Sequence, residues 1–295
     1  MATFQEACLR HSSHYKSVLA RADDLYLEGG NSVIEGLAMF DLDWANIQVA
    51  HAWSTKCAGK DKKAAELCSA FPNAGVYLLA LRQNPIERIQ WLESALDSAK
   101  YLGDRHTEGL HLGNLGNAFY HLGEYRDAIS FYRRRLIVAK EIKDRPGEGN
   151  VLGNLGRTYA ALSKPRKAIE FFKQALTFAQ EVDDKRKEGV WLSNLGLAHA
   201  DLGEFEKAIE AYKQAITIDQ AISDSRGEGV DLGNLGLTYA SLGENQVAID
   251  YYQQALILAR KFGDRRNEGI WLGNLGLAYT ELGDLQKAIE FSDQA

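Results

Sequence analysis

A Gly-Asn-Leu-Gly tetrapeptide recurs along the chain at a fixed interval. It occupies residues 113–116, 153–156, 233–236 and 273–276, and reads Ser-Asn-Leu-Gly at 193–196, so each copy begins 40 residues after the previous one. A period of about 20–50 residues is typical of stacked supersecondary units, each of which packs against its neighbours. The chain is therefore expected to form a repeat array, and such arrays present extended binding surfaces.

Two apolar stripes of helical period lie within each repeat, as residues 107–146 illustrate. The first stripe begins near Leu112 and stops at Gly123, and the second begins at Tyr125 and runs to about Lys143. Apolar residues spaced three and four apart place one apolar face on each helix. Each repeat is therefore predicted to be a pair of helices.

Prolines, glycines and alanines support this division. Pro85 and Pro165 share one register near the start of a second helix, where proline is tolerated. Gly103 and Gly263 precede a turn aspartate and suit the left-handed residue that ends a helix. Small residues recur where the paired helices should approach closely, so bulky replacements should force the helices apart. They are Gly116, Gly156, Gly196, Gly236 and Gly276 on the first helix, and Ala128, Ala168, Ala208, Ala248 and Ala288 on the second.

This pattern resembles the tetratricopeptide repeat (TPR). The residues that match the family's motif in order and spacing are Leu115, Gly116, Phe119, Gly123, Tyr125, Ala128, Tyr132 and Leu136. Members usually have a period of about 34 residues, so this chain is more similar to the long repeats of Pins-type adaptors and of kinesin light chains. The resemblance implies an all-α, right-handed α-solenoid of helix-turn-helix units, which binds a protein or peptide on a concave wall formed by the first helices.

The domain organisation follows from the repeat boundaries. Residues 84–295 are predicted to form the array, with a half repeat at 84–106, full repeats at 107–146, 147–186, 187–226 and 227–266, and a truncated repeat at 267–295. Residues 1–83 lack the repeat and are predicted to form an irregular helical cap, because a stack needs an atypical terminal unit. Since the last predicted helix ends short at Ala295, the chain is expected to be a fragment of a longer protein.

The N-terminal third carries a second resemblance. The runs 35–41, 43–47 and 87–92 are similar to the segment preceding the repeats in bacterial signal-transducing ATPases of the NB-ARC/NACHT type. In those proteins the repeats act as a sensor behind the ATPase. No GxxxxGK[ST] phosphate loop stands in this sequence, so the resemblance implies the sensor part alone.

Composition excludes several other functions. The formal net charge of −6 gives no footprint for nucleic acid or an anionic membrane, and no apolar run is long enough to span a bilayer. Met1 to Lys16 has no secretory apolar region, and the three cysteines form no CxxC pair, so a cytoplasmic protein is expected.

No catalytic, cofactor or metal motif stands out in the sequence. His106, His111 and His121 cluster around one predicted helix, but ordinary surface or groove roles are expected for them. We therefore expect no enzyme, no cofactor and no small-molecule substrate. An enzyme with its site in the N-terminal third is the alternative from a different class.

The candidate binding residues lie on the predicted concave wall. One row consists of Asn114, Asn154, Asn194, Asn234 and Asn274, and a second of Asn117, Arg157, Leu197, Leu237 and Leu277, with Tyr120 beside them. Repeated asparagines can form a ladder for a peptide main chain, or they can bond between helices and hold the stack. The second row predicts a peptide whose acidic part meets Arg157 and whose apolar part lies on the leucines.

Three bulky residues depart from the repeat. Trp191 and Trp271 share one repeat position and are predicted to pack between neighbouring helices, although large aromatic residues can also anchor an interface. Arg135 belongs to a basic run with Arg133 and Arg134 and replaces an alanine found at 175, 215 and 255. The run is expected on a solvated face, and a phosphate site is the alternative.

These patterns favour a protein–protein interaction module, specifically the ligand-sensing part of a larger bacterial signalling protein. A free-standing scaffold or adaptor is the alternative of the same class.

Overall fold

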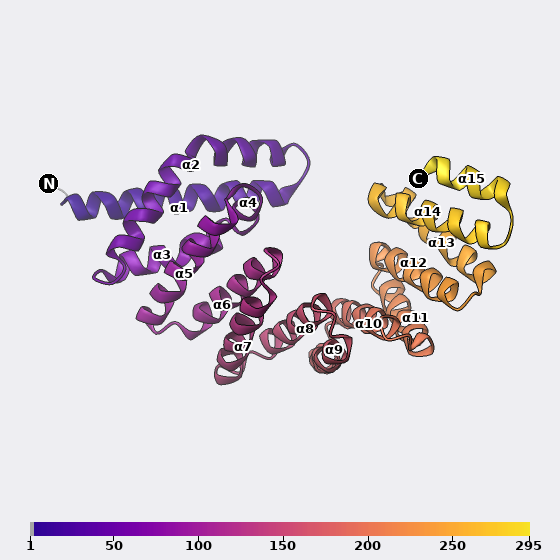
Figure 1. Cartoon of the computed structure of the whole chain (residues 1–295). Helices are drawn as coiled ribbons and strands as arrows, with labels where there is room; N and C mark the ends of the chain where they lie inside the picture. The colour runs from indigo at the N-terminus through magenta and orange to yellow at the C-terminus, as the bar shows by residue number, and fades with distance from the viewer. Residues whose placement is uncertain (1–2) are drawn as a thin grey trace. The chain divides into compact units, whose positions relative to one another are not determined.

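The computed structural model describes residues 3–295, and these form fifteen helices joined by short turns (Figure 1). The chain divides into two compact units, Met1–Asp144 and Arg145–Ala295. The predicted all-α fold of helix-turn-helix units is confirmed. The predicted boundary between cap and array, after residue 83, stays a prediction.

The first unit contains seven helices within its described residues. They are α1 (Phe4–Glu28), α2 (Ser32–Cys57), α3 (Lys62–Ala74), α4 (Val76–Arg82), α5 (Pro85–Leu102), α6 (Arg105–His121) and α7 (Tyr125–Glu141). The long helices α1 and α2 pack along each other, as Figure 1 shows, and α3 packs against both of them and against α5. Helix α5 then packs on α6, and α6 on α7, so the repeat pattern begins inside this unit.

An aromatic core holds the N-terminal helices together. Phe40 and Phe71 are buried beside Trp91 of α5, and the ring of His51 stacks on Trp91 with centroids 3.7 Å apart. Burial disfavours the charged imidazole and lowers the pKa of His51 to about 3. The apolar residues of the N-terminal helices therefore pack against one another and against α5.

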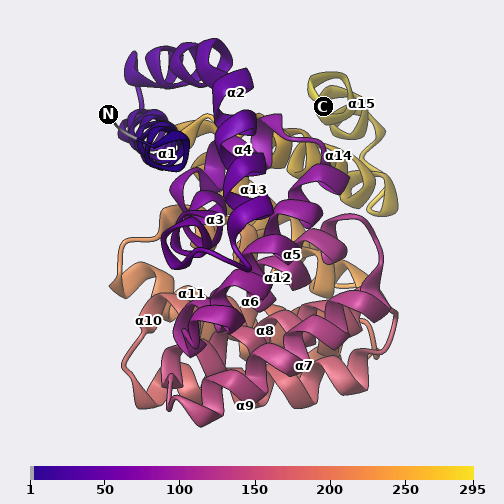
Figure 2. The ribbon, with the colours of Figure 1, turned by 90° about the vertical axis from the view of Figure 1, so that its left-hand side faces the viewer.

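The second unit contains four helix pairs. The first helices are α8 (Arg145–Ala161), α10 (Lys185–Ala200), α12 (Ser225–Ser241) and α14 (Arg265–Glu281), and the second helices are α9 (Pro165–Glu181), α11 (Phe205–Ala221), α13 (Asn245–Phe262) and α15 (Leu285–Gln294). Each first helix packs on its own second helix, as α8 and α9 do in Figure 2. Each of α9, α11 and α13 also packs on the next first helix, and α12 contacts both α10 and α14.

The turn aspartates explain where the first helices begin. The side chains of Asp184, Asp224 and Asp264 each accept a hydrogen bond from the backbone N–H three residues later. An aspartate in this position satisfies a donor that has no partner within the helix, and its charge suits the helix N-terminus. The recurring Asp is therefore a helix cap.

The predicted close approach of paired helices is confirmed. A Cβ atom added at Gly196 would lie 2.6 Å from the ring of Tyr212, and one added at Gly236 would lie 2.7 Å from the ring of Tyr252. The facing alanines Ala208 and Ala248 are completely buried. Glycine and alanine recur at these positions because larger side chains have no room.

The second helices end earlier than the sequence predicts. Helix α7 ends at Glu141, two residues before the predicted Lys143. Lys143 has a left-handed φ of 57°, and the backbone N–H of Asp144 bonds to the carbonyl of Ala139, which reverses the chain. Gly103 and Gly263 adopt the predicted left-handed conformation, with φ of 68° and 66°.

No single helix among residues 3–295 is long and apolar enough to cross a bilayer, and only α3 with α4, as a pair bent by 71°, reaches the necessary length and composition.

Candidate functional site

The predicted binding residues all lie on first helices. Helix α6 carries Asn114, Asn117 and Tyr120, α8 carries Asn154 and Arg157, α10 carries Asn194 and Leu197, α12 carries Asn234 and Leu237, and α14 carries Asn274 and Leu277. The α6 residues belong to the first unit and the others to the second. The residues of each unit are therefore described separately.

Three leucines of the second unit are exposed in line. Leu197, Leu237 and Leu277 are 46%, 49% and 67% exposed, on first helices that contact one another in sequence. Apolar side chains gathered on a surface mark interaction sites. These leucines are the strongest indication of a binding face.

The structure adds three apolar residues that sequence reasoning missed. Val190 and Ile270 are exposed and Val230 is half-buried, and each lies four residues before the asparagine of its helix. Residues spaced four and three apart share one helix face, so these side chains accompany the leucines. We call this set the apolar strip: Val190, Leu197, Val230, Leu237, Ile270 and Leu277. Its signal in the sequence is the same 40-residue spacing.

The asparagines lie within the strip and already make contacts inside the protein. All five are half-buried. The Nδ2 atom of Asn194 donates to the carbonyl of Val190 at 2.7 Å, and Asn234 donates to the carboxylate of Asp231. An amide that donates through nitrogen retains its carbonyl oxygen as an acceptor. Both predicted roles of the asparagine row, helix stabilisation and main-chain recognition, are therefore compatible with this geometry.

The first unit uses its candidate residues partly for packing. The Oδ1 atom of Asn117 accepts a hydrogen bond of 2.7 Å from the Tyr132 hydroxyl, which links α6 to α7. The ring of Tyr120 is half-buried and lies 5.5 Å from that of Tyr125. Arg157, by contrast, is an exposed residue of α8 in the second unit.

The predicted packing role of the two tryptophans is confirmed. Trp191 and Trp271 are buried, and their rings cover Gly153 and Gly233 of the preceding repeats so closely that a Cβ atom there would collide with them. Trp271 also stacks against Tyr252 with ring centroids 6.2 Å apart. These residues join successive repeats and are not surface anchors.

The expectation for Arg135 is wrong. Arg135 is buried, and its Nη2 atom donates to the carboxylate of Asp144 at 2.5 Å. Gly109 on α6 provides the space, because a Cβ atom there would overlap the guanidinium. Arg135, which stands where other repeats have alanine, therefore forms an internal ion pair with Asp144.

The expectation for His111 is also wrong. His111 is completely buried, and the hydroxyl of Ser69 lies 3.2 Å from its Nε2 atom. Burial lowers its pKa to about 4. His106 and His121 are exposed, as predicted. Within residues 3–295 no three His, Cys, Asp or Glu side chains are grouped to hold a metal ion.

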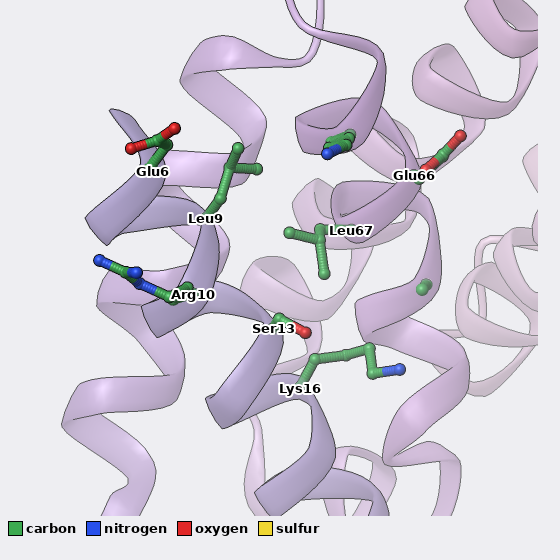
Figure 3. A pocket seen from close by; sticks show the side chains of 9 residues that line it. Glu6, Leu9, Arg10, Ser13, Lys16, Glu66 and Leu67 are labelled. Carbon is green, nitrogen blue, oxygen red and sulfur yellow. The ribbon is translucent and has the colours of Figure 1, made fainter. Parts of the chain in front are cut away.

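A large hollow in the first unit lies between α1 and α3. It has a volume of about 740 Å³, and Figure 3 shows Leu9 and Leu67 pointing toward each other across it. Glu6, Arg10 and Glu66 surround these leucines with charge of both signs. A hollow of mixed charge gives no preference for one ligand class.

Comparison with known structures supports the fold. BtubC (BKLC) from P. vanneervenii is 23% identical, over 72% of this chain and 89% of that protein, with a TM-score of 0.64. Kinesin-light-chain-type TPR-like repeats from Podosopora anserina are 18% identical, over 62% of this chain and 90% of that one, with a TM-score of 0.54.

A third structure extends over nearly the whole chain. A signal transduction ATPase with numerous domains from Pyrococcus horikoshii, which has a tetratricopeptide repeat sensor, is 16% identical, with a TM-score of 0.68. The match covers 99% of this chain and 46% of that protein, so the chain spans less than half of this relative. The match therefore includes the N-terminal helices of this chain as well as its repeats.

Family membership follows from the sequence. No curated protein matches the chain at a significant level. The sequence profile of the tetratricopeptide repeat family matches residues 110–181, 148–221 and 228–295, which is more than half of the chain. Its domains typically bind protein or peptide partners. The chain therefore belongs to the tetratricopeptide repeat family and is a protein-binding module of that family.

Proposed function

We propose that this module binds an extended or helical protein segment across the first helices of its second unit. The observation that carries the proposal is the line of exposed leucines, Leu197, Leu237 and Leu277, on helices that touch one another. Water contacts these side chains in the free protein, so covering them with apolar side chains of a partner is favourable.

The residues around the leucines define the chemistry of the segment. The side-chain oxygens of Asn194 and Asn234 can accept hydrogen bonds from its main-chain N–H groups. Exposed Arg157 lies on α8, at the same repeat position as the leucines. The segment is therefore apolar where it covers Leu197, Leu237 and Leu277, and acidic where it meets α8.

The biological role we propose is ligand sensing within a larger bacterial signalling protein. The similarity of fold to a repeat-bearing signal transduction ATPase, over 99% of this chain, supports this role. As part of the same proposal, the chain binds without catalysis and works in the cytoplasm. Three cysteines present as free thiols, Cys8, Cys57 and Cys68, support the cytoplasmic location.

The test compares two charge substitutions within one repeat. Leu237→Glu places a carboxylate in the apolar strip, whereas Ile257→Glu places one on the second helix α13, where Ile257 is 66% exposed. Partners captured from lysate are quantified by mass spectrometry for the wild type and both variants, after circular dichroism has shown equal helicity. We expect a specific partner to be lost by Leu237→Glu and retained by Ile257→Glu.

Two further results complete the test. Arg157→Glu should weaken binding of the same partner, because it reverses the charge that the acidic part meets. Equal capture by the wild type, Leu237→Glu and Arg157→Glu would move binding away from the first helices and contradict the proposal.

A further inference from the structure

One repeat junction in the second unit departs from its neighbours at three positions. The position of Trp191 and Trp271 is occupied by Asp231, and the glycine that such a tryptophan covers is replaced by Ser193. Asp219 stands where the other second helices have alanine, at 139, 179 and 259. At this junction a serine thus stands in place of the glycine, and aspartates stand in place of the tryptophan and the alanine.

These replacements open a cavity between α10 and α12. It has a volume of about 300 Å³, and Gly189, Asn194, Asp219, Gly227 and Asp231 are among the residues that line it. The equivalent spaces at the tryptophan-containing junctions have volumes of about 10 and 20 Å³. Loss of the indole therefore creates room for a small organic group.

Two buried carboxylates line this cavity. Asp231 is 2% exposed and accepts a hydrogen bond of 2.5 Å from the hydroxyl of Ser193. Asp219 is 5% exposed, and its side-chain carboxylate has no hydrogen-bond or salt-bridge partner among residues 3–295, although its backbone carbonyl accepts a hydrogen bond from the N–H of Asp224. Its two oxygens lie against Gly189 and Gly227, where Cβ atoms would come within 2.8 and 2.5 Å of them. Two glycines thus make room for a carboxylate without a partner.

Neither carboxylate forms a salt bridge with a basic side chain of residues 3–295. Burial raises the pKa of Asp219 to about 6 and that of Asp231 to about 7, because a carboxylate removed from water without a cation disfavours ionisation. Two exposed arginines line the rim. Arg186 pairs with Asp224 at 3.6 Å and its charge partly opposes the rise in the pKa of Asp219, and Arg226 pairs with Asp264 at 3.4 Å. A buried charge of this kind is stabilised only by a charged and hydrogen-bonding partner.

We infer that this cavity receives the ammonium or guanidinium group of a lysine or arginine side chain in the bound segment. The inference deepens the proposed function and rests on it, because Val190 and Asn194 both line the cavity and belong to the face that would hold the segment. A guanidinium donates to two carboxylates in a plane and fills more space than a metal ion. The cavity is thus the part of the binding face that selects a basic residue.

The test uses four small probes on the full chain. N-acetyl-arginine methylamide and N-acetyl-lysine methylamide carry the charge, N-acetyl-citrulline methylamide is the neutral isostere, and ethylguanidinium is the cation without a peptide main chain. Dissociation constants come from the shifts of backbone amide signals of α10 and α12 in NMR titrations.

A matched variant fills the cavity. Ser193→Gly, Asp219→Ala and Asp231→Trp together restore the residues of the neighbouring junctions, so the variant is expected to fold. Its helicity and thermal unfolding are measured beside those of the wild type. A second variant, Asp231→Asn, removes one charge with little change in volume.

The expected result is saturable binding of the arginine or lysine probe to the wild type. Binding should be at least about tenfold weaker for citrulline, for the filled variant and for Asp231→Asn, because each removes a charged partner. Citrulline binding as tight as arginine binding, or undiminished arginine binding by the filled variant, would overturn the inference. Ethylguanidinium binding as tight as the arginine probe would overturn the assignment to a protein segment and indicate a site for free organic cations.

The pH dependence provides a further readout. The charged and titratable groups near the pair are Arg186 from α10, Tyr212 from α11, Asp224 from the turn, and Arg226 and Glu228 from α12. Below about pH 6 both carboxyls bind protons, so the arginine probe should bind more weakly at about pH 5.5 than at about pH 8. Binding that does not change with pH would contradict a role for these carboxylates.

Failure of this inference is distinguishable from failure of the proposed function. If Leu237→Glu abolishes partner capture while no cationic probe binds, the binding face stands and the basic-residue pocket is wrong. If the probes bind but Leu237→Glu leaves partner capture unchanged, the pocket stands and the segment does not lie along the apolar strip.

Discussion

At the scale of single residues, the repeat tolerates strain in its turns. Ser163 adopts a left-handed φ of 54°, whereas the same turn in other repeats has glycine, with φ of 71° at Gly203 and 80° at Gly243. A residue with a Cβ atom is disfavoured in this conformation by about 1–2 kcal/mol. The turn geometry is therefore set by the repeat, and Ser163 conforms to it.

Replacing Ser163 with glycine should stabilise the protein. Glycine removes the backbone strain at this position, but it also makes the unfolded chain more flexible, which offsets part of the gain. The expected net increase in the free energy of unfolding is about 0.5–1 kcal/mol. Urea denaturation monitored by circular dichroism measures it. The reverse change in the sister turn, Gly203→Ser, should destabilise by a similar amount. A loss of stability in Ser163→Gly would show that the serine has a favourable contact that outweighs the strain.

At the scale of helices and their junctions, glycine and tryptophan act as a pair. The ring of Trp271 on α14 covers Gly233 on α12, while Gly273, at the same position of the next repeat, has no atom within 4 Å of its added Cβ. The same substitution should therefore have opposite effects at the two glycines.

Gly233→Ala should destabilise the protein by about 1–3 kcal/mol, because the new methyl group displaces the indole. Gly273→Ala should stabilise it by about 0.5–1 kcal/mol, because alanine is the better helix former and meets nothing. Thermal unfolding of the two variants and the wild type provides the comparison. Shifts of equal sign would mean that the packing of Trp271 on Gly233 does not hold the junction.

The junctions also show how far sequence reasoning extends. The helix pairs, the close-packed glycines and the role of Trp191 were predictable because each feature recurs every 40 residues and one explanation serves every copy. Residues that occur once were not predictable. Arg135 and His111 were expected on the surface, yet their partners are an aspartate in the following turn and a serine 42 residues away.

The binding face was predictable only in part. The exposed leucines follow from the repeat register, since an exposed position stays exposed from one repeat to the next. The cavity at Asp231 was not foreseen, because the replacements at 193, 219 and 231 matter only when the three helices are seen to converge. Contacts between repeats require the geometry of the stack, which a single period does not supply.

At the scale of the whole molecule, the two units contain buried groups with opposite pH responses. In the first unit, burial lowers the pKa of His51 to about 3 and that of His111 to about 4. In the second, burial raises the pKa of Asp219 to about 6 and that of Asp231 to about 7. Linkage then dictates how the stability of each unit changes with pH.

The two pH responses have opposite signs. The unfolded first unit binds more protons than the native one, whereas the unfolded second unit binds fewer protons than the native one. Between about pH 6.5 and 4 the unfolded histidines are protonated while the native ones are not, so the first unit loses stability as pH falls. Between about pH 4 and 7 the native aspartates hold protons that the unfolded ones release, so the second unit loses stability as pH rises. Each group should contribute on the order of 3 kcal/mol across its window, because one unit of pKa shift corresponds to about 1.4 kcal/mol.

Hydrogen exchange of the full chain at about pH 5 and about pH 7.5 can measure both trends, once intrinsic exchange rates are corrected for pH. Protection in α2 and α6 should be greater at the higher pH, and protection in α11 and α12 should be greater at the lower one. Asp231→Asn should flatten the response of the second unit alone. Parallel changes in both units would contradict the linkage argument.

The replacement of tryptophan by Asp231 also affects how the array comes apart. In a linear array, stability is a sum of repeat terms and nearest-neighbour coupling terms, and cooperativity fails first at the weakest coupling. The junction between α10 and α12 has a cavity where its neighbours have an indole. We expect partial unfolding to begin there. A cation bound at that junction would strengthen the weakest coupling of the array. Ligand binding would therefore change the number of repeats that unfold cooperatively.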